Sequence, residues 1–165
     1  MLNQLSLPNA GSVASKTEIM PAEPRDLAPQ LARGVTRLLA EHGYGTLVEF
    51  RLPAARRVDV IGLDRDSRFV IVEIKTSVAD FRADQKWREY LPYCDAFYFA
   101  VPEAFPHVLV PASCGLLIAD AYGAAMVRPA VEMAMNKSRR RHQLLRFALA
   151  ASVRLNRVYD PNGAA

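Results

Sequence analysis

The sequence has few cysteines, since only Cys94 and Cys114 occur among its 165 residues. Two thiolates are too few for a zinc or iron–sulfur centre built from cysteine alone. We therefore expect both to be reduced thiols in a core, and the chain to fold without disulfides. Because 51% of the residues are hydrophobic, one domain of this length can bury an adequate core.

Long hydrophobic runs are also missing. No stretch reaches the roughly eighteen apolar residues that a membrane-spanning helix needs, and the first residues lack the basic-then-apolar order of a signal peptide. Residues 1–24 mix Ser, Asn, Gly and Pro without a helical or strand period, so we expect a flexible leader. The prediction is one domain over residues 25–160, a flexible tail at 161–165 and no membrane partner.

The C-terminal region lacks acidic residues, because none occurs between Asn136 and Tyr159. Its basic residues are Lys137, Arg139, Arg140, Arg141, Arg146, Arg154 and Arg157. Apolar residues recur among them at helical spacing, which predicts a basic amphipathic helix. Such a cluster is the electrostatic footprint of a polyanion-binding surface, although a protein partner or a solvated helix face would show the same pattern.

The hydrophobic patterns predict a mixed α/β protein with the order α-β-β-β-α-β, followed by a hairpin and the basic helix. Ser77 and Asp80 form a capping box that opens the second helix, which the pattern carries to Pro92. This helix is a crossover, so the strand after it should lie parallel to the strand before it. The predicted helices cover residues 27–39, 77–92 and 136–158, and the predicted strands cover 46–52, 57–63, 69–75, 96–101, 115–119 and 124–128.

Two charged residues interrupt one of the apolar strands, where Glu73 and Lys75 share a face. Buried charges are costly unless they are paired or bound to a metal. Together with Asp59, they offer two hard oxygen ligands for Mg²⁺ or Mn²⁺, and an ammonium to orient or deprotonate a water molecule. One lysine cannot neutralise both carboxylates, so we favour a metal site over an internal salt-bridge triad.

The spacing of Asp59, Glu73 and Lys75 resembles the active-site signature of the PD-(D/E)xK nuclease superfamily, with a valine in place of the usual proline before the aspartate. The segments Asp80–Trp87 and Tyr93–Ala100 extend the likeness to the MmcB-related bacterial DNA-repair proteins, a branch of that superfamily. The likeness covers more than half of the chain.

The resemblance implies a restriction-endonuclease-like core with a mixed central sheet flanked by helices. It also implies metal ligation by Asp59, Glu73 and the carbonyl oxygen of Ile74, with Lys75 as a catalytic residue. DNA is the implied partner, together with other DNA-repair proteins, and the many dimers in the superfamily leave a homodimer open. Such a protein would be cytoplasmic and associated with the nucleoid.

Many members of the superfamily bring an additional glutamate from the first helix or the first strand. Glu41 and Glu49 stand at such positions. We favour Glu49 as a catalytic residue because it lies in an apolar strand, where a charge needs a partner, while a surface position is the alternative. Glu41, at a helix end, is expected to face water.

Basic residues near the predicted site are candidates for phosphate contacts, which raise affinity without reading sequence. Lys86 holds the place of the glutamine in the Gln-x-x-x-Tyr helix motif of some superfamily members. Trp87 and Tyr90 share the apolar stripe of the same helix, so we expect them in the core. The predicted nucleic-acid-binding residues are Arg56, Arg57, Lys86, Arg139, Arg140 and Arg141.

We therefore expect a Mg²⁺- or Mn²⁺-dependent nuclease that hydrolyses DNA phosphodiester bonds during DNA repair. The alternative is a catalytically silent DNA-binding or scaffold protein of the same fold. The presence of Asp59, Glu73 and Lys75 together favours the enzyme. An RNA-specific nuclease is less favoured, because no RNA-recognition strand is present.

Overall fold

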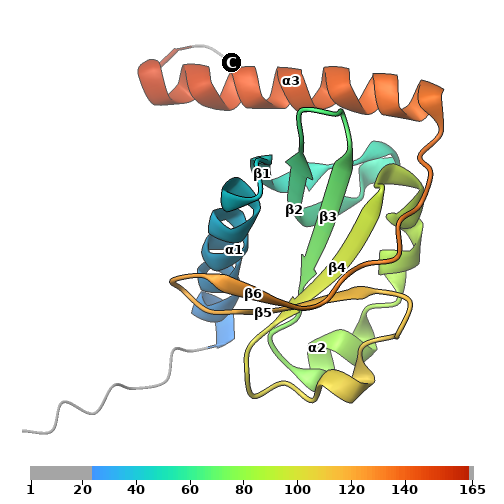
Figure 1. Ribbon diagram of the computed structural model, residues 1–165. Coiled ribbons are helices and arrows are strands. Elements are labelled where there is room, and N and C mark those ends of the chain that lie inside the picture. The colour runs from blue at the N-terminus through green and yellow to red at the C-terminus, as the bar shows by residue number, and fades with distance from the viewer. Residues whose placement is uncertain (1–23, 164–165) are drawn as a thin grey trace, which may run out of the picture.

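A six-stranded mixed sheet with the order β1-β2-β3-β4-β5-β6 forms the centre of the computed structural model, which describes residues 24–163 (Figure 1). The first three strands form an antiparallel meander, β4 runs parallel to β3 and β5 runs parallel to β4, and β6 closes a hairpin with β5. The strands are β1 (Gly45–Arg51), β2 (Arg57–Leu63), β3 (Phe69–Ile74), β4 (Ala96–Val101), β5 (Gly115–Ala119) and β6 (Ala124–Arg128).

Helix α1 (Pro24–Glu41) covers one face of the sheet (Figure 1). Its buried side chains Leu31, Val35 and Leu39 follow one another at a spacing of four residues, so they line a single stripe of the helix. This stripe packs in one core cluster with alternate residues of β3, among them Val70 and Val72.

Helix α3 (Lys137–Tyr159) lies across the end of the sheet, next to the turn that joins β2 to β3 (Figure 1), and its buried Phe147 joins the core on the face opposite α1. Asn136 caps its start by accepting hydrogen bonds from the N–H groups of Ser138 and Arg139. Phe147 inserts between Phe50 and Phe69, with its ring centre 6.0 Å from each of theirs.

The second helix differs from its prediction. Helix α2 (Val78–Ala83) begins at the predicted cap, where the Ser77 hydroxyl accepts the Asp80 N–H at 3.2 Å. It ends at Ala83, so the prediction of a helix that reaches Pro92 is wrong. Asp84 adopts an extended conformation and its Oδ1 accepts the N–H of Lys86 at 2.9 Å, which leaves two short 3₁₀ turns, η2 (Lys86–Glu89) and η3 (Leu91–Tyr93), in place of the last helical turns.

The expectations for the strands, the crossover and the core residues are confirmed, whereas α1 begins at Pro24, the last residue of the predicted leader. The observed strands lie within one residue of their predicted bounds, and β4 is parallel to β3 as the crossover predicted. Cys94 and Cys114 are free and buried, and Trp87 and Tyr90 are core residues. Among the described helices, none is long and apolar enough to cross a membrane. Residues 1–23 of the predicted leader, and the end of the predicted tail, lie outside the described residues.

Candidate active site

The sheet brings Asp59, Glu73 and Lys75 together at a point where its pairing is interrupted. The β2–β3 ladder ends at the pair Val60–Val72, one step before Asp59 and Glu73 would meet. Beyond this step, the Asp59 Oδ2 accepts the N–H of Ile74 at 2.7 Å, so a side chain replaces the missing backbone acceptor. The Asp59 carboxylate therefore lies between β2 and the end of β3.

Glu73 is the most unusual group of this cluster, because it is only 6% exposed and its Oε2 accepts no hydrogen bond from the described residues. Its Oε1 lies 3.4 Å from the ammonium nitrogen of Lys75. Burial, and then the negative charge of Asp59, raise the pKa of Glu73 to about 8. Burial also raises the pKa of Asp59, against the opposing effects of the Ile74 N–H and Lys75. Two adjacent carboxyl groups, one buried and one half-buried, thus have too little positive charge nearby to neutralise both.

Lys75 has a partner that the sequence analysis did not identify. Its Nζ lies 2.6 Å from Asp84 Oδ2 and 3.9 Å from Asp80 Oδ1. Burial alone would lower the pKa of Lys75, but the hydrogen bond to Asp84 and the charges of Glu73 and Asp80 raise it above its usual value. Asp84 follows the last residue of α2, so the early end of that helix is what places its carboxylate beside Lys75.

A groove between α1 and the strands β1, β2 and β3 leads to Asp59. This groove has a volume of about 350 Å³, and Glu49, Asp59 and Ile74 line it together with Arg33 of α1. The β1–β2 pairing omits Glu49 and Asp59, and Glu49 has a left-handed backbone with φ of 48°. A non-glycine residue in this conformation marks local strain, which is commonly found at functional sites.

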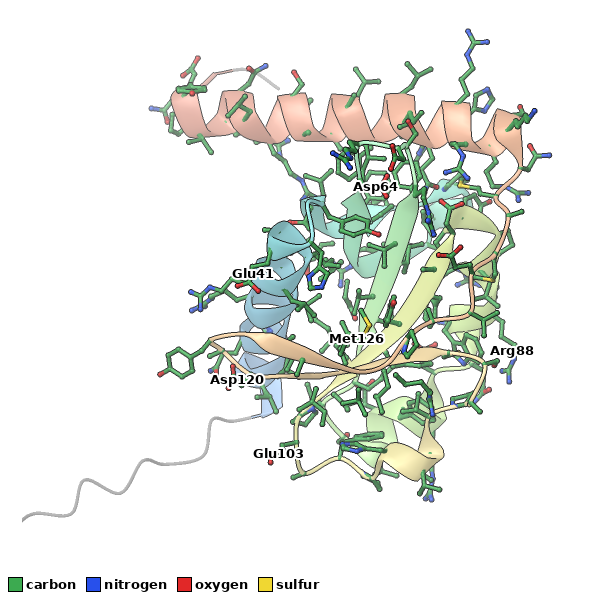
Figure 2. All side chains as sticks on the ribbon, viewed as in Figure 1. Glu41, Asp64, Arg88, Glu103, Asp120 and Met126 are labelled. Atoms are coloured by element: carbon green, nitrogen blue, oxygen red, sulfur yellow. The ribbon has the colours of Figure 1, made fainter. Side chains whose placement is uncertain are left out.

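The two candidates for a fourth acidic residue are placed differently. Glu49 is exposed, lies in the same groove as Asp59 and has its Oε1 3.5 Å from Arg57. Glu41 is exposed near the end of α1 and points away from the sheet (Figure 2). The groove thus contains Glu49, and a catalytic role for Glu49 stays a prediction.

The basic residues predicted to contact phosphates near the site are only partly free to do so. Arg57 is exposed beside Glu49, whereas Arg56 forms a two-point ion pair with Glu89 at 2.7 and 2.9 Å. Lys86 lies in η2 with an exposed side chain, rather than on a helix facing Glu73 as predicted. Arg33 was missed, because one arginine on an amphipathic helix gives no signal that its side chain borders a groove.

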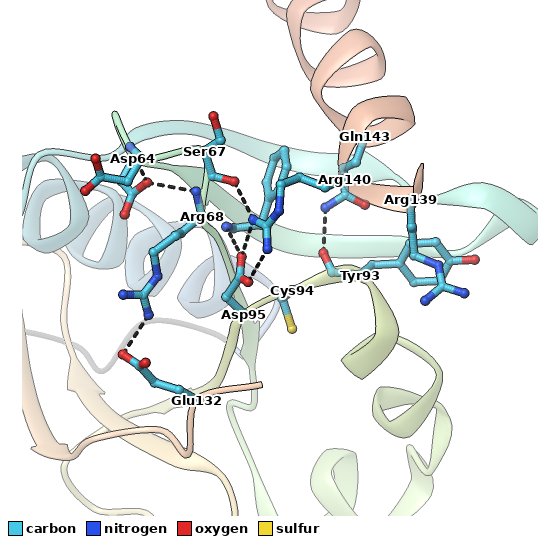
Figure 3. A network of polar contacts seen from close by, with 12 residues as sticks. Asp64, Ser67, Arg68, Tyr93, Cys94, Asp95, Glu132, Arg139, Arg140 and Gln143 are labelled. Atoms are coloured by element: carbon cyan, nitrogen blue, oxygen red, sulfur yellow. Dashed lines mark hydrogen bonds and ion pairs between the residues drawn. The ribbon is translucent and has the colours of Figure 1, made fainter. Parts of the chain in front are cut away.

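The arginines that open α3 lie near the starts of β3 and β4, at the opposite end of β3 from Glu73 (Figures 1 and 3). Arg140 donates to both carboxylate oxygens of the buried Asp95 and to the carbonyl of Ser67. Its guanidinium is thus used by the fold, and a phosphate contact by Arg140 stays a prediction. Arg139 donates to the Pro92 carbonyl at 3.1 Å and lies over the Tyr93 ring, while Arg141 is exposed.

The described residues contain no group of three His, Cys, Asp or Glu side chains in position to hold a metal ion. The donors at this end of the sheet are two carboxylates, Asp59 and Glu73, and the carbonyl of Ile74, the residue that follows Glu73. The buried, unpartnered Oε2 of Glu73 is the kind of atom that a hard cation would satisfy. The residues therefore fit a divalent cation whose remaining ligands are water or phosphate oxygens.

The fold and the pair of acids on neighbouring strands define a mixed α/β protein with a PD-(D/E)xK-like arrangement. Residues 17–162 match the family described as DNA repair protein MmcB-like. The chain belongs to this family.

Two solved structures are similar to the chain. One is the SPO1766 protein of unknown function from Silicibacter pomeroyi, with 43% sequence identity and a TM-score of 0.82, over 87% of this chain and 97% of that one. The other is a repair endonuclease from Pyrococcus abyssi, with 19% identity and a TM-score of 0.34, over 52% of this chain and 40% of that one. No curated protein matches the chain.

Proposed function

We propose that the protein is a DNA-repair nuclease that uses Mg²⁺ or Mn²⁺ to hydrolyse DNA phosphodiester bonds. The observation that carries this proposal is the buried Glu73 carboxyl group, which has an oxygen without a hydrogen-bond partner among the described residues and lies next to the half-buried carboxyl group of Asp59. A structural salt bridge would satisfy both acids, whereas this cluster leaves a negative site for a cation.

Asp59, Glu73 and the Ile74 carbonyl would hold the metal, which when bound would stabilise charge on the phosphate and on the leaving oxygen. The chain's own groups have the remaining tasks. Lys75, fixed by Asp84 and kept protonated by its raised pKa, would orient the attacking water. Arg33 and Arg57 would hold phosphates in the groove that leads to Asp59.

A second candidate is a catalytically silent DNA-binding or scaffold protein that acts in repair. The short contact between Lys75 and Asp84 favours it, because a lysine held at 2.6 Å by a carboxylate is also what a purely structural ion pair requires. This protein would bind DNA through the same groove, and recruit other repair proteins, without cutting.

The test is cleavage of labelled single-stranded, duplex, nicked and branched DNA with Mg²⁺ or Mn²⁺. We expect metal-dependent products that are lost in Asp59→Asn and Lys75→Ala, and retained in Asp66→Asn, which removes an exposed carboxylate from the β2–β3 turn. Calorimetric titration with Mn²⁺ should show binding that Asp59→Asn weakens at least tenfold, about 1.4 kcal/mol.

Tight DNA binding without cleavage of any substrate would favour the silent protein. In that case Asp84→Asn, which removes the carboxylate that holds Lys75, should reduce stability and leave DNA binding unchanged. In the nuclease, the same change should lower the cleavage rate and change its pH profile, because it alters the charge environment of Lys75.

A further inference from the structure

A second cavity lies at the start of α3, separate from the groove that contains Asp59. It has a volume of about 320 Å³, which is large enough for a phosphate group and part of a nucleotide. Among the described residues, its lining contains basic side chains and no acidic one. The lining includes Tyr93, Ser138, Arg139, His142, Gln143 and Arg146.

Arg139, His142 and Arg146 follow one another along one side of α3, within about two helical turns or some 10 Å. Arg139 and Arg146 each use part of the guanidinium to bond a backbone carbonyl, of Pro92 and Arg51 respectively. A guanidinium has five N–H donors, so both retain donors for another ligand. The positive end of the α3 dipole adds to the attraction for an anion.

Gln143 gives an independent sign of a ligand. It is only 2% exposed, and its Nε2 donates to the Tyr93 carbonyl at 2.6 Å, which fixes the orientation of the amide. Its Oε1 then points away from the Tyr93 carbonyl, toward the side where Arg139 lies (Figure 3), and it has no hydrogen-bond partner among the described residues. A buried acceptor without a donor is costly, so the cavity suits a ligand that also carries an O–H or N–H donor.

A terminal nucleotide that carries a phosphate combines the two requirements. Its phosphomonoester has a second pKa near 6, so close to two arginines it is a dianion that accepts hydrogen bonds from them. The base or the sugar of the same nucleotide has N–H or O–H groups that can donate to Gln143 Oε1. The phosphodiester inside a DNA strand carries only one negative charge.

The cavity is connected to the Asp59 groove by shared residues. A third groove, between β1 and α3, is lined by Glu49, Arg51, Arg146 and Arg154. It shares Arg146 with the cavity at the start of α3, and Glu49 with the groove that contains Asp59. Arg154 donates to the carbonyls of Val48 and Glu49, so basic side chains follow the path along β1, which is an edge strand.

We propose that the cavity at the start of α3 binds the phosphorylated end of a DNA strand through Arg139, His142, Gln143 and Arg146. From this end, the DNA strand would follow β1 toward Asp59. The proposal rests on the proposed function for the identity of the polymer. Such a cavity would make the protein specific for phosphorylated DNA ends. In an active nuclease, it would place the cut a few nucleotides from the bound end.

The experiment measures binding of short single strands that carry a 5′-phosphate, a 3′-phosphate or hydroxyls at both ends, by fluorescence anisotropy in EDTA with the full chain. We expect one phosphorylated end to strengthen binding about tenfold, as charge-assisted hydrogen bonds would. His142→Ala and Arg139→Ala should reduce this preference to within about twofold, whereas Arg141→Ala, on the exposed side of the same helix, should keep it. Equal binding of all three strands, or a preference that survives in both cavity variants, would overturn the proposal.

Two further measurements separate this proposal from the nuclease assignment. Addition of a deoxynucleoside 5′-monophosphate should shift the NMR signals of the Gln143 side-chain amide; an unchanged signal would count against the site. Competition by inorganic phosphate as strong as that by a phosphorylated end would assign the cavity to free phosphate and overturn the DNA-end proposal. An end preference without cleavage would support the site and reject the nuclease, and cleavage without an end preference would do the reverse.

Discussion

Two charged clusters are buried in this sheet, and they differ in how completely their charges are satisfied. At the start of β4, Asp95 accepts the Phe69 N–H at 2.7 Å and a two-point ion pair from Arg140 (Figure 3). At the end of β3, Glu73 shares one lysine with Asp84 and keeps an unpartnered oxygen. The carboxylate of the first cluster has all its hydrogen-bond and charge partners among the described residues, whereas that of the second cluster does not.

The direction of the pKa shifts agrees with this difference. Burial alone would raise the pKa of Asp95, but the hydrogen bonds from Arg140 and Phe69 hold it below its usual value. At Glu73 burial and the neighbouring Asp59 act in the same direction, and the pKa rises to about 8. A buried acid can thus be either a fixed part of the fold or a group that needs an external cation, and its partners decide which.

The largest effect should come from breaking the complete cluster. Arg140→Ala leaves the buried Asp95 without its counter-charge, and we expect a loss of about 3–5 kcal/mol in the free energy of unfolding. Urea denaturation measures it. Arg141→Ala, an exposed change on the same turn, should stay within about 0.5 kcal/mol of the wild type. A loss for Arg140→Ala as small as that for Arg141→Ala would show that the cluster at Asp95 does not stabilise the fold.

Removing the charge of Glu73, in the incomplete cluster, should increase the free energy of unfolding at high pH. Because the pKa of Glu73 is raised in the folded state, its contribution to stability is fully present below about pH 4.5 and is lost as pH rises to about 8. Glu73→Gln has no such titration, so above pH 8 and without metal it should be more stable than the wild type, by on the order of a few kcal/mol.

Thermal unfolding from pH 5 to 9 tests this expectation, with the exposed Glu103→Gln as the control. Mn²⁺ should reverse the order of stability at high pH, because it would bind the wild-type carboxylate and not the amide. If wild type and Glu73→Gln show the same pH dependence, Glu73 does not titrate as proposed, and the contrast with Asp95 fails.

The sequence predicted the fold because each strand is a separate apolar segment with its own turn signals. It also predicted that Glu73 and Lys75 share a face, since alternation along a strand fixes which side chains do so. Asp59 lies beside them because β2, which contains it, pairs with β3. The prediction failed where a local bond overrides periodicity. Asp84 ends α2 by bonding Lys75 and the Lys86 N–H, and no hydrophobic pattern records such bonds.

The basic helix shows a second limit of sequence analysis. Its arginines suggested one polyanion-binding surface, but the structure divides them by their position around the helix. Arg140 pairs with Asp95, while Arg146 and Arg154 bond carbonyls of the edge strand β1. Composition reveals that a helix is basic, whereas the use of each charge depends on the surface against which the helix packs.

The smallest change in stability should come from breaking the ion pair of Arg56 and Glu89, whose side chains are 35% and 51% exposed. Arg56→Ala should leave the urea midpoint of unfolding close to that of the wild type, because solvent screens this pair whereas it screens Asp95 and Arg140 far less. If Arg56 also contacts a DNA phosphate, the slope of log affinity against log salt should fall by about one. Denaturation and salt-dependent DNA binding measure the two effects separately, and a stability loss as large as that of Arg140→Ala would place Arg56 with the buried clusters instead.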